Sequence, residues 1–443
     1  MNQTIDHVTI WDGGEGLVSD GSIRIRDGQI RGVFPAGALE DAPCDRRIDG
    51  TGKLAIPGLI CAHTHLYSAL ARGLAIPGYA PATFTQILEQ LWWRLDKALD
   101  DDSLLASGMV GAMEAARCGI TTLIDHHASP HAVDGSLDLL RDAVCNRVGL
   151  RGAFCYEVSD RDGPSIRAAG IRENARFLAD LADDDTMCAG HFGLHASFTL
   201  EDDAFEEIAA TLPDNAGVHI HVAEGPEDEA VCRAEHGMTV VERLDRHGLL
   251  RPSSILVHCL HVDDSEKDLI ADRGAVVVHN PRSNMNNAVG SFDLDGFLDR
   301  GIVTGLGTDG LGANLLAELF TAGIAQKHTR GDCMAGGFDQ LDRLLFRGNP
   351  EIAKRVLGIE FGQIVPDAPA DIALLDYVPP TPLTAGNLLG HLLFGVAVHA
   401  LRVADLFVAG RQILANGRFV DLDEGHEYAA ARHQAQRLWQ LIG

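Results

Sequence analysis

The sequence lacks the features that define several common classes of protein. No apolar run reaches the roughly 20 residues that a transmembrane helix needs. Residues 1–16, MNQTIDHVTIWDGGEG, contain neither the basic start nor the apolar stretch of a secretory signal peptide. The nine cysteines are an odd number and form no C-x-x-C pair. These absences predict a cytoplasmic protein whose cysteines stay reduced and act neither as metal ligands nor as nucleophiles.

Positive charge is also scarce. The chain has 36 Lys and Arg residues against 63 Asp and Glu residues, which gives a net charge of −27. A field of this sign repels nucleic acid and anionic membranes. The acidic residues are spread along the chain, as on a solvated surface, and do not form a tail. We therefore expect a small-molecule partner, with no nucleic acid and no membrane.

The pattern of apolar residues divides the chain into three parts. Short β segments with DGG and RDGQ turns fill residues 1–57, and β-type segments return at 367–424. We expect these two ends to pair into one small β-sandwich. Between them, residues 58–366 alternate apolar strands with helical stretches, and residues 425–443 read as a C-terminal helix. The eight expected strands are 59–65, 120–127, 150–157, 188–196, 217–224, 254–261, 275–280 and 302–309. Eight such units predict an α/β fold of the (β/α)8 TIM-barrel type.

Histidines and acids gather at the ends of these strands. His63 and His65 are two residues apart in CAHTHL, so on a strand both side chains point to the same face. His221 lies near the end of a later strand, and Asp309 is the last residue of the final one. The carboxyl ends of barrel strands meet at the face where barrel enzymes carry their active sites. Four nitrogen and oxygen ligands gathered there suit one catalytic divalent metal, Zn²⁺ first and Fe²⁺ as the alternative.

Several motifs together resemble the amidohydrolase superfamily. They are IPGLICAHTHLYSALARG, GITTLIDHH, GLHASFTL, HIHVAEG, VHCLH, HNPRSNMNNAVG, GLGTDG and DAPADIALLD. The resemblance covers nearly the whole chain. It falls in the mononuclear cyclic-amidine deaminase and chlorohydrolase branch. HTHLYSALARG, LWWRLDKALD and IDHHASP are most similar to the selenium-metabolism-associated aminohydrolase group. Dinuclear relatives carry a bridging lysine on the fourth strand, whereas CAGHFGLHA has none, which agrees with one metal.

The resemblance implies roles for individual residues. His63, His65, His221 and Asp309 match the metal ligands. Glu224 matches the glutamate that shuttles protons, and with Asp309 it would accept protons as water attacks the substrate. His258 matches the histidine that polarises the water or the tetrahedral intermediate.

Other residues are expected to contact the substrate. His195 matches a residue that does so in relatives. His127 follows the second strand, and Trp92 or its neighbour Trp93 could stack on a flat ring. Tyr67, Arg282 and Asn284 complete the expected pocket.

The sequence leaves more than one reaction open. The preferred hypothesis is a metal-dependent hydrolase that acts on C–N bonds and removes ammonia from an aminated N-heterocycle of the purine, pterin or pyrimidine kind. The alternative is ring-opening of a cyclic amide, as in purine breakdown, and dechlorination of a triazine-like ring comes third. The hypothesis of a non-catalytic binding protein on a degenerate barrel is disfavoured, because the set of predicted ligand and catalytic residues is complete. The resemblance also implies a homo-oligomer.

Overall fold

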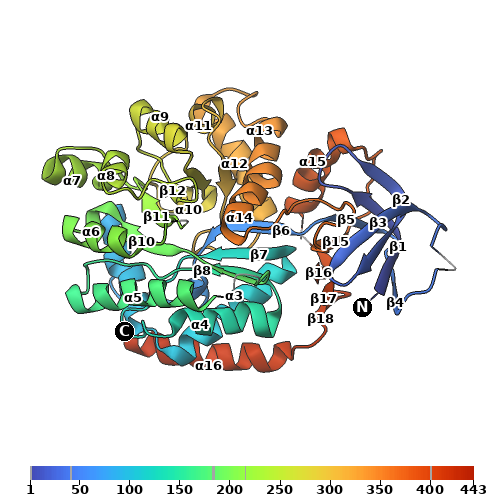
Figure 1. The fold of residues 1–443 in the computed structure, drawn as a ribbon, viewed down its shortest axis with the longest axis horizontal. Helices are drawn as coiled ribbons and strands as arrows, with labels where there is room; N and C mark the ends of the chain where they lie inside the picture. Colours follow the sequence, from blue (N-terminus) through green and yellow to red (C-terminus); the bar gives the residue numbers. More distant parts are fainter. Residues whose placement is uncertain (1, 40–41, 182–184, 215, 400–401) are drawn as a thin grey trace.

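A barrel of parallel strands forms the centre of the molecule (Figure 1). The computed structural model describes residues 2–39, 42–181, 185–214, 216–399 and 402–443. One group of neighbouring parallel strands is β6 (Leu59–Thr64), β7 (Ile120–Asp125), β8 (Arg151–Phe154) and β9 (Cys188–Gly190). The other is β10 (Phe192–Ala196), β11 (Val218–Val222), β12 (Ile255–His258), β13 (Val276–His279) and β14 (Thr304–Leu306). All eight strand positions expected from the sequence are occupied.

Two seams close the barrel. β9 and β10 are one strand interrupted at His191, and beyond the interruption the Val158 amide donates to the Gly193 carbonyl at 3.1 Å. At the other seam the Thr308 amide donates to the His63 carbonyl at 2.9 Å. A parallel bridge between Thr64 and Asp309 lies beside it. The prediction of a TIM barrel is therefore confirmed, and its last strand lies against its first at three of the predicted ligands, His63, His65 and Asp309.

Helices cover the outside of the barrel (Figure 1). The longer ones are α3 (Asp101–Arg117), α5 (Pro164–Asp180), α6 (Asp202–Thr211), α7 (Pro226–His236), α9 (Asp264–Arg273), α12 (Leu315–Arg330) and α14 (Asn349–Leu357). Shorter ones are α1 (Phe84–Ile87), α2 (Trp93–Ala98), α4 (Ser136–Arg141), α8 (Val240–Arg246), α10 (Pro281–Asn286), α11 (Leu294–Asp299), α13 (Phe338–Asp342) and α15 (Leu388–Gly390). Local sequence fixes their ends: α9 begins with an Asp263–Glu266 capping box and ends at Gly274, whose φ is 71°.

The two ends of the chain build one sheet beside the barrel. Its strands run in the order β18 (Arg418–Phe419), β17 (Arg411–Ala415), β16 (Val403–Val408), β15 (Ile372–Asp376), β5 (Lys53–Pro57), β1 (Asn2–Trp11), β2 (Leu17–Arg26) and β3 (Gln29–Pro35), with β4 (Arg46–Asp49) on β1. The ends meet where β15 pairs antiparallel with β5. These strands bury an apolar core of their own, which includes Ile5, Ile23 and Phe407. The expected extra β domain is present, as one continuous sheet. We propose the domain division 1–57 with 367–424, 58–366 and 425–443.

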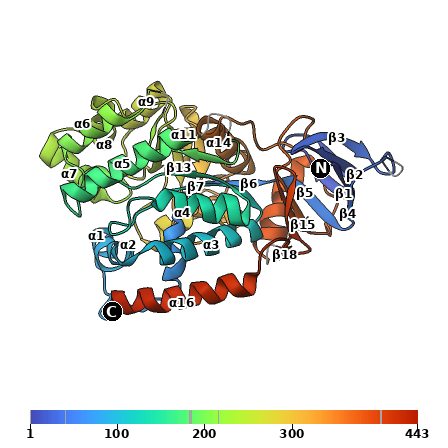
Figure 2. The same cartoon turned by 60° about the horizontal axis from the view of Figure 1, so that its bottom comes forward.

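The C-terminal helix ties the sheet side of the molecule to the barrel. α16 (Glu424–Ile442) packs along α3 and reaches α2 (Figure 2). The Trp439 indole N–H donates to the Leu70 carbonyl at 2.8 Å, just after β6, the first strand of the barrel. Across the described part of the chain, no helix combines the length and apolarity required to cross a bilayer.

Candidate active site

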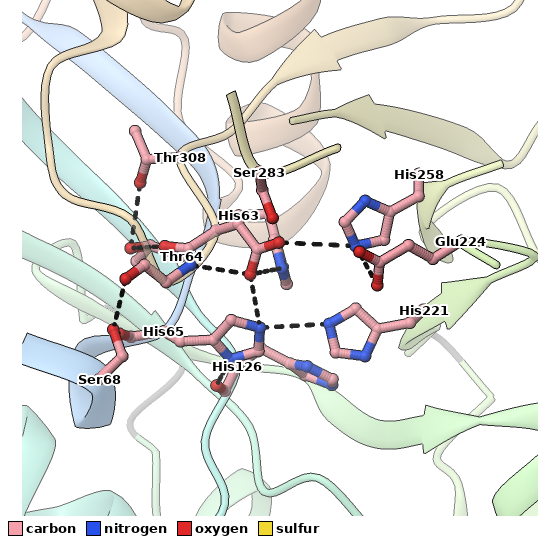
Figure 3. Close-up of polar contacts among 12 residues, drawn as sticks. His63, Thr64, His65, Ser68, His126, His221, Glu224, His258, Ser283 and Thr308 are labelled. Atoms are coloured by element: carbon pink, nitrogen blue, oxygen red, sulfur yellow. Dashed lines mark hydrogen bonds and ion pairs between the residues drawn. The ribbon is translucent and has the colours of Figure 1, made fainter. Parts of the chain in front are cut away.

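Three imidazoles and one carboxylate meet at the carboxyl end of the barrel. His65 Nε2 lies 3.2 Å from His221 Nε2 and 3.2 Å from Asp309 Oδ1. His63 Nε2 lies 3.9 Å from the same Asp309 oxygen. Figure 3 shows the His65 and His221 rings pointing toward each other from opposite strands. The structure therefore brings together all four predicted metal ligands.

Hydrogen bonds on the far side of each ring decide which nitrogen faces the centre. His65 Nδ1 donates to the His126 carbonyl at 2.6 Å, and His221 Nδ1 donates to the His195 carbonyl at 2.9 Å. His63 Nδ1 contacts His219 Nε2 at 2.9 Å. With Nδ1 protonated, each Nε2 presents a lone pair to the centre. Three lone pairs converging on one point repel one another unless a cation lies between them.

Two buried nitrogens at the centre have no hydrogen-bond partner among the described residues: His63 Nε2 and His258 Nε2. Burial holds the pKa values of His63 and His221 well below their usual range, so both rings are neutral. Burial lowers the pKa of His65 too, but the hydrogen bond and charge of Asp309 outweigh it and raise the pKa to about 9. A positive charge is thus favoured where the rings meet Asp309. Neutral imidazoles with a carboxylate are the donor set of a Zn²⁺ site.

Glu224 and His258 stand beside this centre. His258 Nε2 lies 3.3 Å from Glu224 Oε2 and 3.8 Å from Asp309 Oδ2 (Figure 3). Asn284 Nδ2 contacts His258 Nδ1 at 2.8 Å, and Asn287 Nδ2 donates to Glu224 Oε1 at 3.2 Å. Burial, and then the charge of Asp309, raise the pKa of Glu224 well above its usual range. A carboxyl group whose pKa is raised in this way is suited both to take and to give a proton.

The backbone is strained where three of these side chains leave their strands. Ala223, His258 and Asp309 have φ values of 45°, 74° and 52°, in the left-handed region that residues other than glycine rarely adopt. Such conformations cost roughly 1–3 kcal/mol each and gather at functional sites. Here they turn Glu224, His258 and Asp309 toward one point at the mouth of the barrel.

A cavity of about 850 Å³, which includes its open mouth, lies above the ligands. Three predicted substrate contacts line it: Tyr67, Trp92 and His195. So do the aromatic residues Phe84, Trp93 and Phe198, the polar residues Ser283 and Asn287, and the acids Asp96, Glu157 and Glu224. An aromatic wall facing a few convergent polar groups is typical of a pocket for a flat organic ring.

The other three predicted contacts do not line this cavity. His127 is fully buried and its Nε2 contacts Ser129 Oγ at 2.8 Å, whereas its neighbour His126 faces the metal ligands. Arg282 directs its guanidinium to Glu318, 3.7 Å away. Asn284 reaches His258 behind the wall of the cavity. The reason is helical geometry: α10 presents Ser283 and Asn287, four residues apart, on the cavity side.

Sequence reasoning missed four acids of the cavity wall: Asp96, Glu157, Glu227 and Asp228. Glu157 is the last residue of the expected strand 150–157, and the position was itself a usable signal because acids at barrel strand ends face the site. Burial raises the pKa of Glu157 to about 7. Asp96 lies on α2, outside any strand, and its sequence context carried no such signal.

Fold and site together define a barrel hydrolase built around a metal centre. Comparison with known proteins agrees, because residues 54–413 match the model of the Amidohydrolase family. The 5′-deoxyadenosine deaminase of Methanothermobacter thermautotrophicus is 31% identical over 96% of each chain. The 5-methylthioadenosine/S-adenosylhomocysteine deaminase of Pelotomaculum thermopropionicum is 28% identical over 97% of each. The chain belongs to the amidohydrolase family.

Solved structures agree on the fold. An adenosine deaminase from Xanthomonas campestris with bound zinc superposes with a TM-score of 0.84 at 23% identity, covering 99% of both chains. The atrazine chlorohydrolase of Arthrobacter aurescens in complex with zinc gives a TM-score of 0.81 at 22% identity, covering 98% of this chain. At these identities the likeness concerns the barrel with its added β domain.

Proposed function

We propose that this chain is a metal-dependent aminohydrolase that replaces the amino group of an N-heterocycle with oxygen and releases ammonia. The observation that carries the proposal is the largely buried Glu224, which lies 3.3 Å from His258 and lines the cavity beside the ligand set. The match to relatives named as deaminases over 96% and 97% of this chain supports the same reaction. The enzyme is thus a hydrolase of C–N bonds other than peptide bonds.

One divalent ion per chain, Zn²⁺, is the proposed cofactor. His63, His65, His221 and Asp309 would hold it through the three inward Nε2 atoms and the carboxylate. When bound, such an ion lowers the pKa of a water molecule toward about 7 and polarises the bond under attack.

The side chains around the ion carry the protons. Glu224 takes one proton from the attacking water and passes it to the ring nitrogen next to the reacting carbon. Asp309 accepts the second proton, and His258 stabilises the negative charge that develops on the oxygen. A C–O bond forms, the C–N bond to the amino group breaks, and the amine leaves as ammonia with the second proton. Asn284 fixes the His258 ring by its hydrogen bond to Nδ1.

Assays with a panel of aminated purines, pterins and pyrimidines test the reaction, together with the substrates named for the relatives, 5′-deoxyadenosine, 5-methylthioadenosine and S-adenosylhomocysteine. Release of one ammonia, with a product 1 Da heavier than its substrate, is expected from replacing NH₂ by OH. Gain of one water without ammonia would assign ring-opening instead. We further propose that the enzyme is a cytoplasmic homo-oligomer that acts on a small molecule. Sedimentation of the purified protein tests the assembly.

A further inference from the structure

Two buried carboxylates in the cavity wall each have one oxygen atom without a hydrogen-bond partner in the described residues. Glu157 Oε1 lies 3.2 Å from His195 Nε2, while Oε2 lies 3.8 Å from His126 Nδ1, too far for a hydrogen bond, and has no hydrogen-bond partner in the described residues. Asp96 Oδ2 lies 3.2 Å from an Arg161 nitrogen, while Oδ1 likewise has none there. Both side chains are at least 97% buried, with exposed fractions of 3% and 2%. We call this pair the Asp96–Glu157 wall.

Charged and aromatic side chains surround the wall. The Arg161 guanidinium lies over the Trp93 ring, 4.9 Å from its centroid, and the Trp93 indole N–H has no partner in the described part of the chain. Asp96, Trp93 and Glu157 all line the cavity. Buried polar atoms without partners destabilise a protein and are rare. Their concentration in one cavity therefore points to a ligand that supplies hydrogen-bond donors to the two carboxylates.

The distance of the wall from the reaction centre limits which part of a ligand it can touch. Polar atoms of Glu157, His195 and His221 all lie within 4.8 Å of one another. His221 is a proposed metal ligand, so the Glu157 carboxylate lies beside the proposed metal site, where the proposed reaction would hold the ring under attack. It therefore faces the heterocycle itself and not a substituent farther out.

Resting on the proposed deamination, we propose that the Asp96–Glu157 wall selects rings in which a lactam N–H flanks the amino-bearing carbon. Guanine, pterin and isocytosine have this 2-amino-oxo arrangement. Their N–H donates to the Glu157 carboxylate, and further N–H or O–H groups reach Asp96. In adenine the amino-bearing carbon is flanked by one ring nitrogen with a lone pair and by one ring carbon, so no N–H donor stands beside it, and a lone pair facing a carboxylate is repelled. The adenosine-type compounds named for the relatives are then poor substrates of this chain.

Substrate ranking by the metal-loaded wild-type enzyme is the first test. The kcat/KM for guanine and pterin should exceed that for adenine and 5′-deoxyadenosine by about 10²-fold or more, since sites built to bind a donor reject analogues that lack it. A reversed ranking, with the adenine compounds faster, overturns the inference and leaves the deaminase function standing.

Variants of Glu157 test whether this residue causes the preference for rings with a lactam N–H. Glu157→Leu keeps a similar volume without an acceptor, so kcat/KM for pterin should fall roughly 10²-fold, while that for 5′-deoxyadenosine should hold or rise because the repulsion of its ring lone pair is removed. Glu157→Gln, whose amide oxygen still accepts, should recover part of the loss. Glu206→Leu, on the exposed face of α6, is the matched control and should change neither rate. An equal loss on both substrate sets with normal metal content would assign Glu157 a structural role.

Binding separates this inference from the proposed reaction. Pterin is fluorescent, so its affinity for the metal-loaded wild type and for Glu157→Leu can be measured without turnover. If no compound loses ammonia, the proposed function fails, and the inference still requires that pterin binds at least tenfold more tightly to the wild type than to Glu157→Leu. Equal affinities overturn it. If Glu157→Leu does not fold, the wild-type ranking and Glu157→Gln decide.

Discussion

Buried charges occur at both ends of the barrel, but only one set is fully paired. At the amino end of the strands, the Arg151 guanidinium donates two hydrogen bonds to the Asp371 carboxylate, at 2.7 and 3.1 Å. Asp371 also accepts from the Ala409 amide at 2.7 Å. At the carboxyl end, His63 Nε2, His258 Nε2 and Glu157 Oε2 have ionisable neighbours at 3.3–3.9 Å but no hydrogen-bond partner among the described residues. The charges at the amino end, which we call the saturated end, have all their hydrogen bonds and hold the barrel to the end sheet. Those at the carboxyl end, the unsaturated end, lack hydrogen-bond partners in the described part of the chain and are arranged for a ligand.

Metal removal should have the largest effect, because it acts on the unsaturated end alone. Dialysis against a chelator should reduce deamination to background, and one equivalent of Zn²⁺ per chain should restore it. Elemental analysis of protein purified without added metal should find one ion per chain. Two ions per chain, or none after supplementation, would contradict the ligand assignment. The Arg151–Asp371 end should be unaffected, so the far-UV circular dichroism spectrum should remain that of a folded barrel.

Glu224→Gln should come next and separate proton transfer from metal binding. The amide keeps the shape of the side chain but cannot take a proton, so turnover should fall by about 10²-fold or more, the low end for general acid–base catalysis. Metal content should remain near one per chain.

Asp309→Asn is the matched comparison for Glu224→Gln. It removes the charge 3.2 Å from His65, so both metal affinity and rate should fall. Rate and metal content measured together on the two variants decide the roles. Near wild-type activity in Glu224→Gln would make that residue an ordinary acid of the cavity rim.

A substitution at the saturated end should lower the stability of the protein without changing its catalytic rate. Arg151→Met leaves Asp371 buried without its cation, which should lower the free energy of unfolding by about 3–5 kcal/mol. The kcat of the folded, metal-loaded enzyme should match wild type. Arg411→Met is the control, because its pair with Asp421 has side chains 49% and 60% exposed and should contribute at most about 1 kcal/mol. Urea unfolding checks both. A lower kcat in Arg151→Met would show that the two ends are coupled.

The difference between the two ends also explains what the sequence could predict. The alternation of strands and helices and the spacing of His63 and His65 follow from local periodicity, so the barrel and the ligand candidates could be predicted. The partners of Arg282 and Asn284 depend on which side of α10 each occupies. The contribution of Asp96 depends on where α2 packs over the barrel mouth. Such tertiary placements leave no periodic trace in the sequence.

Cys259→Ala should have the smallest effect, although it lies next to the site. The residue follows His258, is 1% exposed, and burial raises the pKa of its thiol well above the usual range, so no thiolate is available to bind metal or attack substrate. Its backbone amide donates to the Val222 carbonyl at 2.9 Å, and alanine keeps this bond. Loss of the buried sulfur should cost about 1 kcal/mol of stability. Metal content and most of the turnover should remain, as measured by elemental analysis and ammonia release. Loss of the ion in Cys259→Ala, with the fold intact, would make the thiol a metal ligand and would contradict the prediction that the cysteines bind no metal.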